Sequence, residues 1–276
     1  MRGIITEVNA DLYTIYVDNR KFTAKARGVF RKRHIEPKVG DICLLSNEGI
    51  ITDILPRKNT LDRPFVSNID ILFIVTSLKS PDFSTNLLDK FLIIAYLNNI
   101  KPIICYSKED LLDKDEHKEI FNILSYYKKI GYTVVSNRDI KEIKKIIKGN
   151  TCCFTGQTGA GKSTLLNSLD KNLKLKTDEI SKALGRGKHT TRLTTLYSVA
   201  GGYMLDTPGF SDIDISKFSD EDIRNSFIEF KKYPCKYRDC NHTKEDECSV
   251  KKAVRDGHIL KSRYDNYLLF IERRKR

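Results

Sequence analysis

An eight-residue stretch that begins at Gly156 limits the folds open to this chain more than any other feature. Its letters, GQTGAGKS, fit the pattern G-x-x-x-x-G-K-[ST] of phosphate-binding loops. The apolar run 151–155 before it predicts a short buried strand, and the segment 163–169 after it predicts the start of a helix. A strand, a glycine-rich loop and a helix in this order predict a P-loop α/β domain.

The residue types in this loop suit the binding of a nucleotide phosphate. Glycines let backbone N–H groups converge on an anion, and the N-terminus of the helix adds a partial positive charge. Lys162 is expected to reach the β- and γ-phosphates, and the Ser163 hydroxyl to bind Mg²⁺. The predicted nucleotide contacts here are Gly156, Gln157, Thr158, Gly159, Ala160, Gly161, Lys162, Ser163 and Thr164.

Two further short motifs indicate which nucleotide is bound. The sequence Asp206-Thr-Pro-Gly209 follows a predicted strand and fits D-x-x-G, so we expect Asp206 to hold Mg²⁺ through its water shell and the Gly209 N–H to touch the γ-phosphate. The sequence Ser107-Lys108-Glu109-Asp110 resembles the guanine-reading signature N-K-x-D. A carboxylate at Asp110 accepts hydrogen bonds from guanine N1–H and N2–H₂, which adenine lacks.

The guanine-reading motif differs from the usual signature in one residue. Ser107 stands where the signature has Asn, which predicts weaker guanine binding, while the main discriminator, Asp110, is kept. Lys108 is expected to lie along the base. Ser136-Asn137 is a loose match to the S-A-K motif of GTPases.

The order of these motifs is rotated. Ordinary GTPases run from the P-loop through a switch threonine and D-x-x-G to the guanine reader, whereas here residues 107–110 precede residues 156–163. The same sheet can form from a chain whose ends have been joined and cut elsewhere, because chain termini usually lie close together. The motif order therefore predicts a circularly permuted GTPase domain.

The flanking segments predict a multidomain chain. Five short β-rich runs within residues 1–64 indicate a small barrel of the OB type, and strands alternating with helices between residues 65 and 215 indicate a mostly parallel sheet covered on both faces. The loop 27–34 is basic and contains Phe30, which we expect to stack on RNA bases. Residues 55–60 are expected to be a linker. In residues 216–276, helices are expected near 219–231 and 258–272.

Three cysteines and one histidine near the C-terminus have the spacing of a metal site. They are Cys235, Cys240, His242 and Cys248. Three thiolates and one imidazole complete a tetrahedral Zn²⁺ site with no open position, so the metal is expected to be structural. The short C-terminal segment buries little apolar surface by itself, which gives such a metal a physical task. The other four cysteines lie in apolar runs and are expected in the core.

Composition limits the partners and the location. The net charge is +13 and the sequence pI is about 9.3, which favours a polyanionic partner such as RNA, although the excess is spread along the chain. No apolar run approaches the ~18 residues of a membrane span, and the N-terminus lacks a signal-peptide core, so we expect a cytoplasmic protein without a membrane partner. A monomer is the default expectation.

Taken together, the rotated motifs, the loop Gly185–Thr191, the N-terminal barrel and the Cys/His cluster resemble the RsgA (YjeQ/YloQ) family of bacterial small-subunit-dependent GTPases. The resemblance spans essentially the whole chain. It implies a GTPase that binds the small ribosomal subunit and its rRNA and acts in late maturation of that subunit. It also assigns one structural Zn²⁺ to the same four Cys and His residues.

Hydrolysis is expected to be slow without a partner. Phe210 follows the D-x-x-G motif where Ras-type enzymes place a water-orienting Gln, and Phe cannot polarise water. His189 is the best local substitute, and Thr190 or Thr191 is expected to supply a second Mg²⁺ contact. The motif at residues 206–209 leads directly into the C-terminal segment, so loss of the γ-phosphate is expected to move that segment.

Two alternatives stay open at this point: an rRNA-binding switch that hydrolyses little GTP, and a P-loop ATPase or kinase, which Asp110 disfavours.

Overall fold

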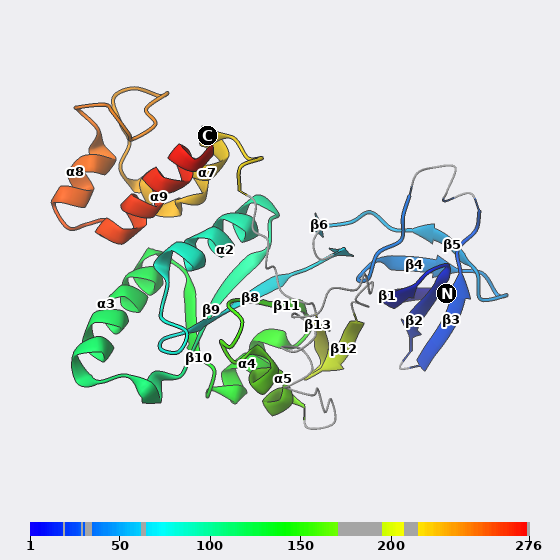
Figure 1. Ribbon diagram of the computed structural model, residues 1–276. Coiled ribbons are helices and arrows are strands. Elements are labelled where there is room, and N and C mark those ends of the chain that lie inside the picture. Colours follow the sequence, from blue (N-terminus) through cyan, green and yellow to red (C-terminus); the bar gives the residue numbers. More distant parts are fainter. Residues whose placement is uncertain are drawn as a thin grey trace.

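A computed structural model describes residues 1–18, 20–28, 30, 35–61, 65–170, 195–206 and 215–274 (Figure 1). The strands are β1 (Arg2–Asn9), β2 (Leu12–Val17), β3 (Arg20–Lys25), β4 (Ile42–Leu45), β5 (Ile51–Ile54), β6 (Thr60–Leu61), β7 (Val66–Ser67), β8 (Ile71–Ser77), β9 (Lys101–Ser107), β10 (Thr133–Ser136), β11 (Thr151–Thr155), β12 (Thr195–Val199) and β13 (Gly202–Asp206). The helices are α2 (Thr85–Leu97), α3 (Lys114–Ile130), α4 (Ile140–Ile147), α5 (Lys162–Leu169), α7 (Asp220–Ser226), α8 (Ser249–Arg255) and α9 (Lys261–Arg274), with 3₁₀ turns η1 (Glu109–Leu111) and η4 (Ile228–Lys232).

The first five strands close into the expected OB-type barrel. Strand β1 pairs with both β2 and β4, β2 pairs with β3, and β4 pairs with β5, all antiparallel. A parallel bridge between Ala26 and Ile51 joins the end of β3 to β5 and completes the ring. Alternate residues point inward, as a closed barrel requires, and Ile5, Ile15 and Ile51 are fully buried in its core.

The central sheet has the strand order β10-β9-β8-β11-β13-β12, and its first five strands are parallel (Figure 1). Its two faces carry separate apolar clusters. Along β8, Leu72 and Ile74 pack toward the side of α2 and α3, while Phe73 and Val75 pack toward the side of α4 and α5. This confirms the predicted parallel sheet covered on both faces, and it explains why β8 reads as one continuous apolar run.

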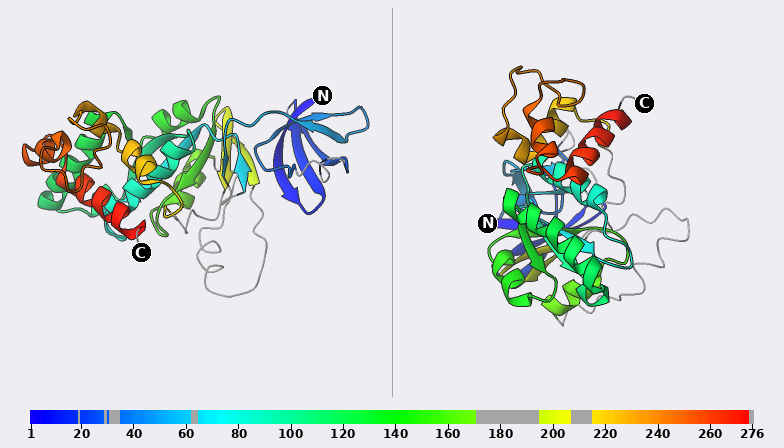
Figure 2. Two further views of the ribbon diagram at one scale, coloured as in Figure 1. Left: turned by 90° about the horizontal axis from the view of Figure 1, so that it is seen from above. Right: turned by 90° about the vertical axis from the view of Figure 1, so that its left-hand side faces the viewer.

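The barrel is joined to the central sheet by main-chain pairing. Strand β1 pairs with β12, with Glu7 opposite Thr195, so barrel and sheet share one hydrogen-bonded ladder. The ring of Tyr16 on β2 meets that of Tyr203 on β13 edge to face, with centroids 6.3 Å apart. Figure 2 shows the β12–β13 hairpin between the barrel and the rest of the sheet. The barrel therefore continues the sheet on the side of β12.

The C-terminal helices pack on the opposite side of the molecule, against α2 (Figures 1 and 2). Phe227, Phe230, Tyr267 and Phe270 form the aromatic centre of their core, and Ile93 of α2 belongs to the same cluster. Ile93 thus connects this small core to the central domain.

The structure corrects three sequence-based expectations and adds one helix. Phe30 is buried and packs in the barrel core with Ile5 and Ile15, so its ring is unavailable to stack on a base. The helix expected over 219–231 breaks at Phe227, whose backbone leaves helical geometry before η4 begins. Part of the expected linker, Thr60, pairs with Ser67 in a small hairpin. Helix α8 was not expected, because its seven residues give too short a pattern.

Candidate nucleotide pocket and metal centre

The P-loop has the predicted context, between the fully buried strand β11 and helix α5. Gly156 has φ of +135°, and a Cβ at this position would lie 2.0 Å from the carbonyl oxygen of Val75, so only glycine fits. Gly159 and Gly161 also have positive φ, and Gly161 caps the N-terminus of α5. These conformations turn the loop tightly around the helix end, where an anion binds most favourably.

The ammonium group of Lys162 is held inside this loop. Its Nζ donates to the carbonyl oxygens of Gly156 and Gln157, each at 2.7 Å. Burial lowers the pKa of Lys162 to about 8. A partly desolvated cation oriented by two carbonyl groups suits a phosphate ligand, whose negative charge would restore the usual preference for the charged amine.

Ser107 brings the predicted guanine reader against the P-loop. Its side chain is buried, and its Oγ donates to the carbonyl oxygen of Ala160 at 2.7 Å. Both Ser107 at the end of β9 and the P-loop after β11 lie at the carboxyl edge of the parallel sheet, where such sheets bind ligands. Two motifs about fifty residues apart in sequence thus meet at one site, with Ser107 bracing the loop.

The other residues of the reader lie at the surface beside Ser107. Lys108 has a left-handed backbone, with φ of +59°, and its Nζ donates to the carbonyl oxygen of Ser80. Glu109 and Asp110 form the 3₁₀ turn η1. Asp110 Oδ1 accepts from Arg138 Nη2 at 2.7 Å, and both side chains are exposed. Arg138 directly follows Ser136-Asn137, the loose match to S-A-K, and was not predicted as a site residue.

Several predicted site residues lie outside the part of the chain that the structure describes. These are His189, Thr190, Thr191 and Gly209, together with Phe210 and the loop that contains Gly185. The backbone of Asp206 ends β13, which runs parallel to β11, so this residue reaches the same carboxyl edge as the P-loop.

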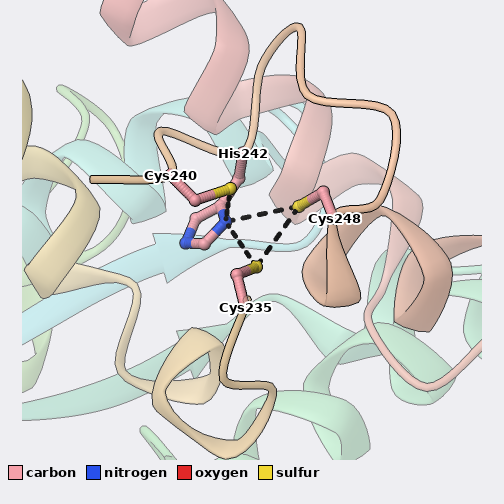
Figure 3. A group of neighbouring side chains, drawn as sticks. All are labelled: Cys235, Cys240, His242 and Cys248. Atoms are coloured by element: carbon pink, nitrogen blue, oxygen red, sulfur yellow. Dashed lines mark hydrogen bonds between the residues drawn. The ribbon is translucent and has the colours of Figure 1, made fainter. Parts of the chain in front are cut away.

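The four predicted zinc ligands converge (Figure 3). His242 Nδ1 lies 3.5 Å from Cys235 Sγ, 3.4 Å from Cys240 Sγ and 3.3 Å from Cys248 Sγ, and the Sγ atoms of Cys235 and Cys248 are 3.7 Å apart. A tetrahedral ion with Zn–S of about 2.3 Å and Zn–N of about 2.0 Å would set these edges at about 3.5 and 3.8 Å. The cluster therefore fits zinc in ligand type and in size.

Burial opposes charge on two side chains of the cluster. It raises the pKa of Cys240 to about 12 and lowers the pKa of His242, so the thiol resists ionisation and the imidazole is neutral. Cys235 differs: burial opposes ionisation, but the N–H groups of Ser249 and Val250 at the start of α8 hold its pKa below the usual value. A dication would stabilise the thiolates, while neutral imidazole is the form that binds metal.

Neighbouring side chains hold the ligand loop in place. Tyr264 and Tyr267 of α9 donate to the carbonyl oxygens of His242 and Asn241 at 2.7 and 2.5 Å. Cys248 caps the N-terminus of α8, with its Sγ accepting from the Lys251 N–H at 3.4 Å. The loop that carries the Cys/His cluster therefore contacts both α8 and α9.

The fold and the site define a P-loop GTPase whose motifs occur in circularly permuted order. Known proteins agree. The RsgA GTPase family matches residues 54–216, and the RsgA N-terminal domain matches residues 2–50. The chain belongs to the RsgA GTPase family, and it is a GTP hydrolase.

Curated relatives and solved structures match the chain along almost its whole length. The "Small ribosomal subunit biogenesis GTPase RsgA" of Limosilactobacillus reuteri is 44% identical, with 98% of this chain and 95% of the relative covered. That of Enterococcus faecalis is 42% identical, covering 98% and 94%. The crystal structure of YjeQ from Thermotoga maritima superposes with a TM-score of 0.86 at 34% identity, covering 98% and 97%. YloQ, described as a circularly permuted GTPase, gives 0.85 at 33%, covering 99% and 94%.

Proposed function

We propose that this GTPase acts in the biogenesis of the small ribosomal subunit, binding the subunit and hydrolysing GTP there. The names of both bacterial relatives support this role, and the match extends through the barrel and the C-terminal segment as well as the GTPase core. The accompanying organisation is a barrel over residues 1–64, the permuted GTPase domain over 65–215 and a zinc-binding helical domain over 216–276. We propose a monomer that works in the cytoplasm.

The observation that carries the nucleotide assignment is the hydrogen bond from Ser107 to Ala160. It brings the guanine-reading motif and the phosphate-binding loop into contact, as one nucleotide spanning both requires. In this proposal Asp110 and Lys108 hold the guanine, and Lys162 and the P-loop N–H groups hold the phosphates. GTP brings Mg²⁺ with it, bound by Ser163 and Thr191 or Thr190, with Asp206 acting through water.

The catalytic assignments depend on residues 189–191 and on Lys162. His189 would orient or deprotonate the attacking water, because Phe210 offers no polar group for that task. Lys162 would stabilise the charge that develops on the transferred phosphoryl group. Gly209 would sense the γ-phosphate. Binding to the subunit would then order these groups and raise the rate.

The proposal also includes a structural zinc ion and contacts with rRNA. One structural Zn²⁺ bound by the cluster of Cys235, Cys240, His242 and Cys248 would stabilise the C-terminal domain. The barrel and this domain extend from opposite sides of the GTPase core, so each is free to contact rRNA. The net charge of +13 supports a polyanionic partner. None of the described helices combines the length and apolar character needed to cross a membrane.

The test is GTP turnover by the purified protein with and without small ribosomal subunits. Large subunits serve as the control, because they offer RNA of similar charge. We expect small subunits alone to raise the rate, and His189→Ala to bind the subunit but remain slow. Equal rates with either subunit or with none would contradict the proposal.

A further inference from the structure

Arg138 lies beside the proposed guanine pocket, and its backbone is fixed. It follows β10 and precedes α4, in a loop whose Asn137 N–H donates to the carbonyl oxygen of Tyr106 on β9 at 2.8 Å. The Arg138 N–H donates to Ser136 Oγ at 3.3 Å, and its carbonyl oxygen accepts from the Ile140 N–H at 2.9 Å. The start of the Arg138 side chain is thereby anchored near the end of β9, where the reader begins.

The side chain of Arg138 reaches the carboxylate that selects guanine. Its Nη2 lies 2.7 Å from Asp110 Oδ1, and 65% of the Arg138 side chain and 54% of the Asp110 side chain are exposed. A pair this exposed adds little to stability, so it does not explain the arrangement by itself. Both groups also keep unused bonding capacity: a guanidinium has five N–H donors, and a carboxylate has about four lone-pair sites.

The edge of guanine offers a match to both groups. Its N1–H and N2–H₂ groups can donate hydrogen bonds to the Asp110 carboxylate. The neighbouring O6 is an acceptor and can bind a donor from the protein. In protein–DNA complexes, arginine is the side chain most often used to contact guanine O6 and N7. When Asp110 bonds N1–H and N2–H₂, O6 is the next group along the same edge of the base, and Arg138 is the guanidinium that lies 2.7 Å from Asp110.

We propose that Arg138 determines guanine specificity together with Asp110, by donating to O6 while it stays paired with the carboxylate. This inference rests on the proposed guanine pocket. Adenine would bind weakly for two reasons. It lacks the N1–H and N2–H₂ donors that Asp110 binds in guanine, and it has an amino group at the position of O6, where Arg138 needs an acceptor. The contact would also compensate for Ser107 in place of Asn, since the Ser107 hydroxyl already donates to the carbonyl oxygen of Ala160.

The experiment is calorimetry of GDP and 6-thio-GDP binding to the full-length wild type and to Arg138→Ala. The analogue keeps N1–H and N2–H₂ but replaces O6 by sulfur, a much weaker acceptor. We expect Arg138→Ala to lose about tenfold in GDP affinity, as for one charge-assisted hydrogen bond at a partly exposed site. The wild type should prefer GDP over 6-thio-GDP by a similar factor, and the variant should bind the two nucleotides about equally.

Two control variants separate hydrogen bonding from charge. Lys141→Ala removes an exposed positive charge three residues away on α4 and should leave both affinities unchanged. Arg138→Lys keeps the charge without the planar fork and should restore only part of the preference for GDP.

The outcomes distinguish this inference from the proposed function. If the wild type binds ADP as tightly as GDP, the guanine pocket itself is wrong. If the wild type selects GDP but Arg138→Ala keeps the full preference over 6-thio-GDP, Arg138 does not contact O6. Tighter GDP binding by Arg138→Ala would also overturn the inference, because Arg138 would then be only a counter-ion that the base displaces.

Discussion

The guanidinium of Arg263 on α9 lies 2.6 Å from the carboxylate of Asp89 on α2, measured from Nη1 to Oδ1, and both side chains are almost completely buried. Glu229 accepts two further hydrogen bonds from Arg263, at 2.8 and 2.9 Å. Tyr127 and Asn266 donate to Asp89 at 2.5 and 2.7 Å. This network fixes the C-terminal helices to the GTPase core, so α9 and α2 are expected to move together.

Replacing Arg263, the positively charged member of this network, should therefore destabilise the contact between the C-terminal helices and the GTPase core. Arg263→Met leaves two buried carboxylates without their partner, which typically costs about 3–5 kcal/mol. We expect lower urea resistance and faster hydrogen exchange in α9. Lys261→Ala on the same helix removes only the exposed pair with Asp265 and should change stability by less than about 0.5 kcal/mol. Equal stability of the two variants would show that the network does not hold the domains together.

Metal content tests the Cys/His cluster. The purified protein should carry one zinc, measured by mass spectrometry, and Cys240→Ser should lose most of it because a hydroxyl is a poor zinc ligand. Chelation should speed hydrogen exchange in α8, whose N-terminal cap is the ligand Cys248. Asp246→Asn changes an exposed carboxylate within the same loop and should keep the metal. A wild type that is equally protected with and without zinc would contradict the structural role.

Nucleotide affinity should fall as the pH rises through 8. Burial lowers the pKa of Lys162 to about 8, so the free protein loses this cation above that pH, while bound phosphate favours the charged form. If only the protonated form binds, GDP affinity should fall about fourfold from pH 7 to pH 8.5. Calorimetry in two buffers of different ionisation enthalpy should detect proton uptake on binding at pH 8.5. Binding without proton uptake would mean that Lys162 is already charged in the free protein.

Ser107→Ala should weaken nucleotide binding without changing base preference. The variant leaves the buried carbonyl oxygen of Ala160 without its hydrogen bond, and we expect about fivefold weaker binding from a loss near 1 kcal/mol. The factor should be the same for GDP and IDP, because Ser107 contacts the P-loop rather than the base. A loss confined to GDP would instead place Ser107 at the purine.

The two phenylalanines of the barrel should have separate effects. Phe30→Ala opens a cavity in the barrel core and should cost about 3–5 kcal/mol of stability. Phe22 on β3 is 42% exposed and adjoins the exposed Arg20 and Lys21, so Phe22→Ala should keep the fold but weaken binding to small subunits severalfold. Filter binding and thermal unfolding measure the two quantities. Loss of subunit binding by a fully folded Phe30→Ala would reverse this assignment.

The sequence predicted most of what local pattern and motif order determine. Continuous apolar runs identified strands such as β8 and β11, and the Cys/His spacing identified a cluster that the structure brings together. The rotated motifs predicted a permuted GTPase, which the structural matches confirm.

Other features depend on contacts between distant residues, which no local pattern reveals. Phe30 looked accessible because its neighbours are basic, yet its ring belongs to the barrel core. The pairing of β1 with β12 joins segments nearly two hundred residues apart, and the ion pair of Arg263 with Asp89 joins two helices. Arg138 stands at the third position of the loose S-A-K match, but the motif alone does not reveal its 2.7 Å contact with Asp110.

The most direct test of the central claim, that Asp110 and the P-loop form one guanosine nucleotide pocket, is calorimetry of Asp110→Asn with GDP and XDP. An Asn side chain has a carbonyl oxygen that accepts and an NH₂ group that donates. Guanine presents donors at both N1 and N2, whereas xanthine has a donor at N1 and a carbonyl oxygen at position 2, so Asn matches xanthine better. We predict that the wild type prefers GDP and that the variant prefers XDP, each by at least about tenfold. Unchanged preference for GDP in Asp110→Asn would contradict the claim.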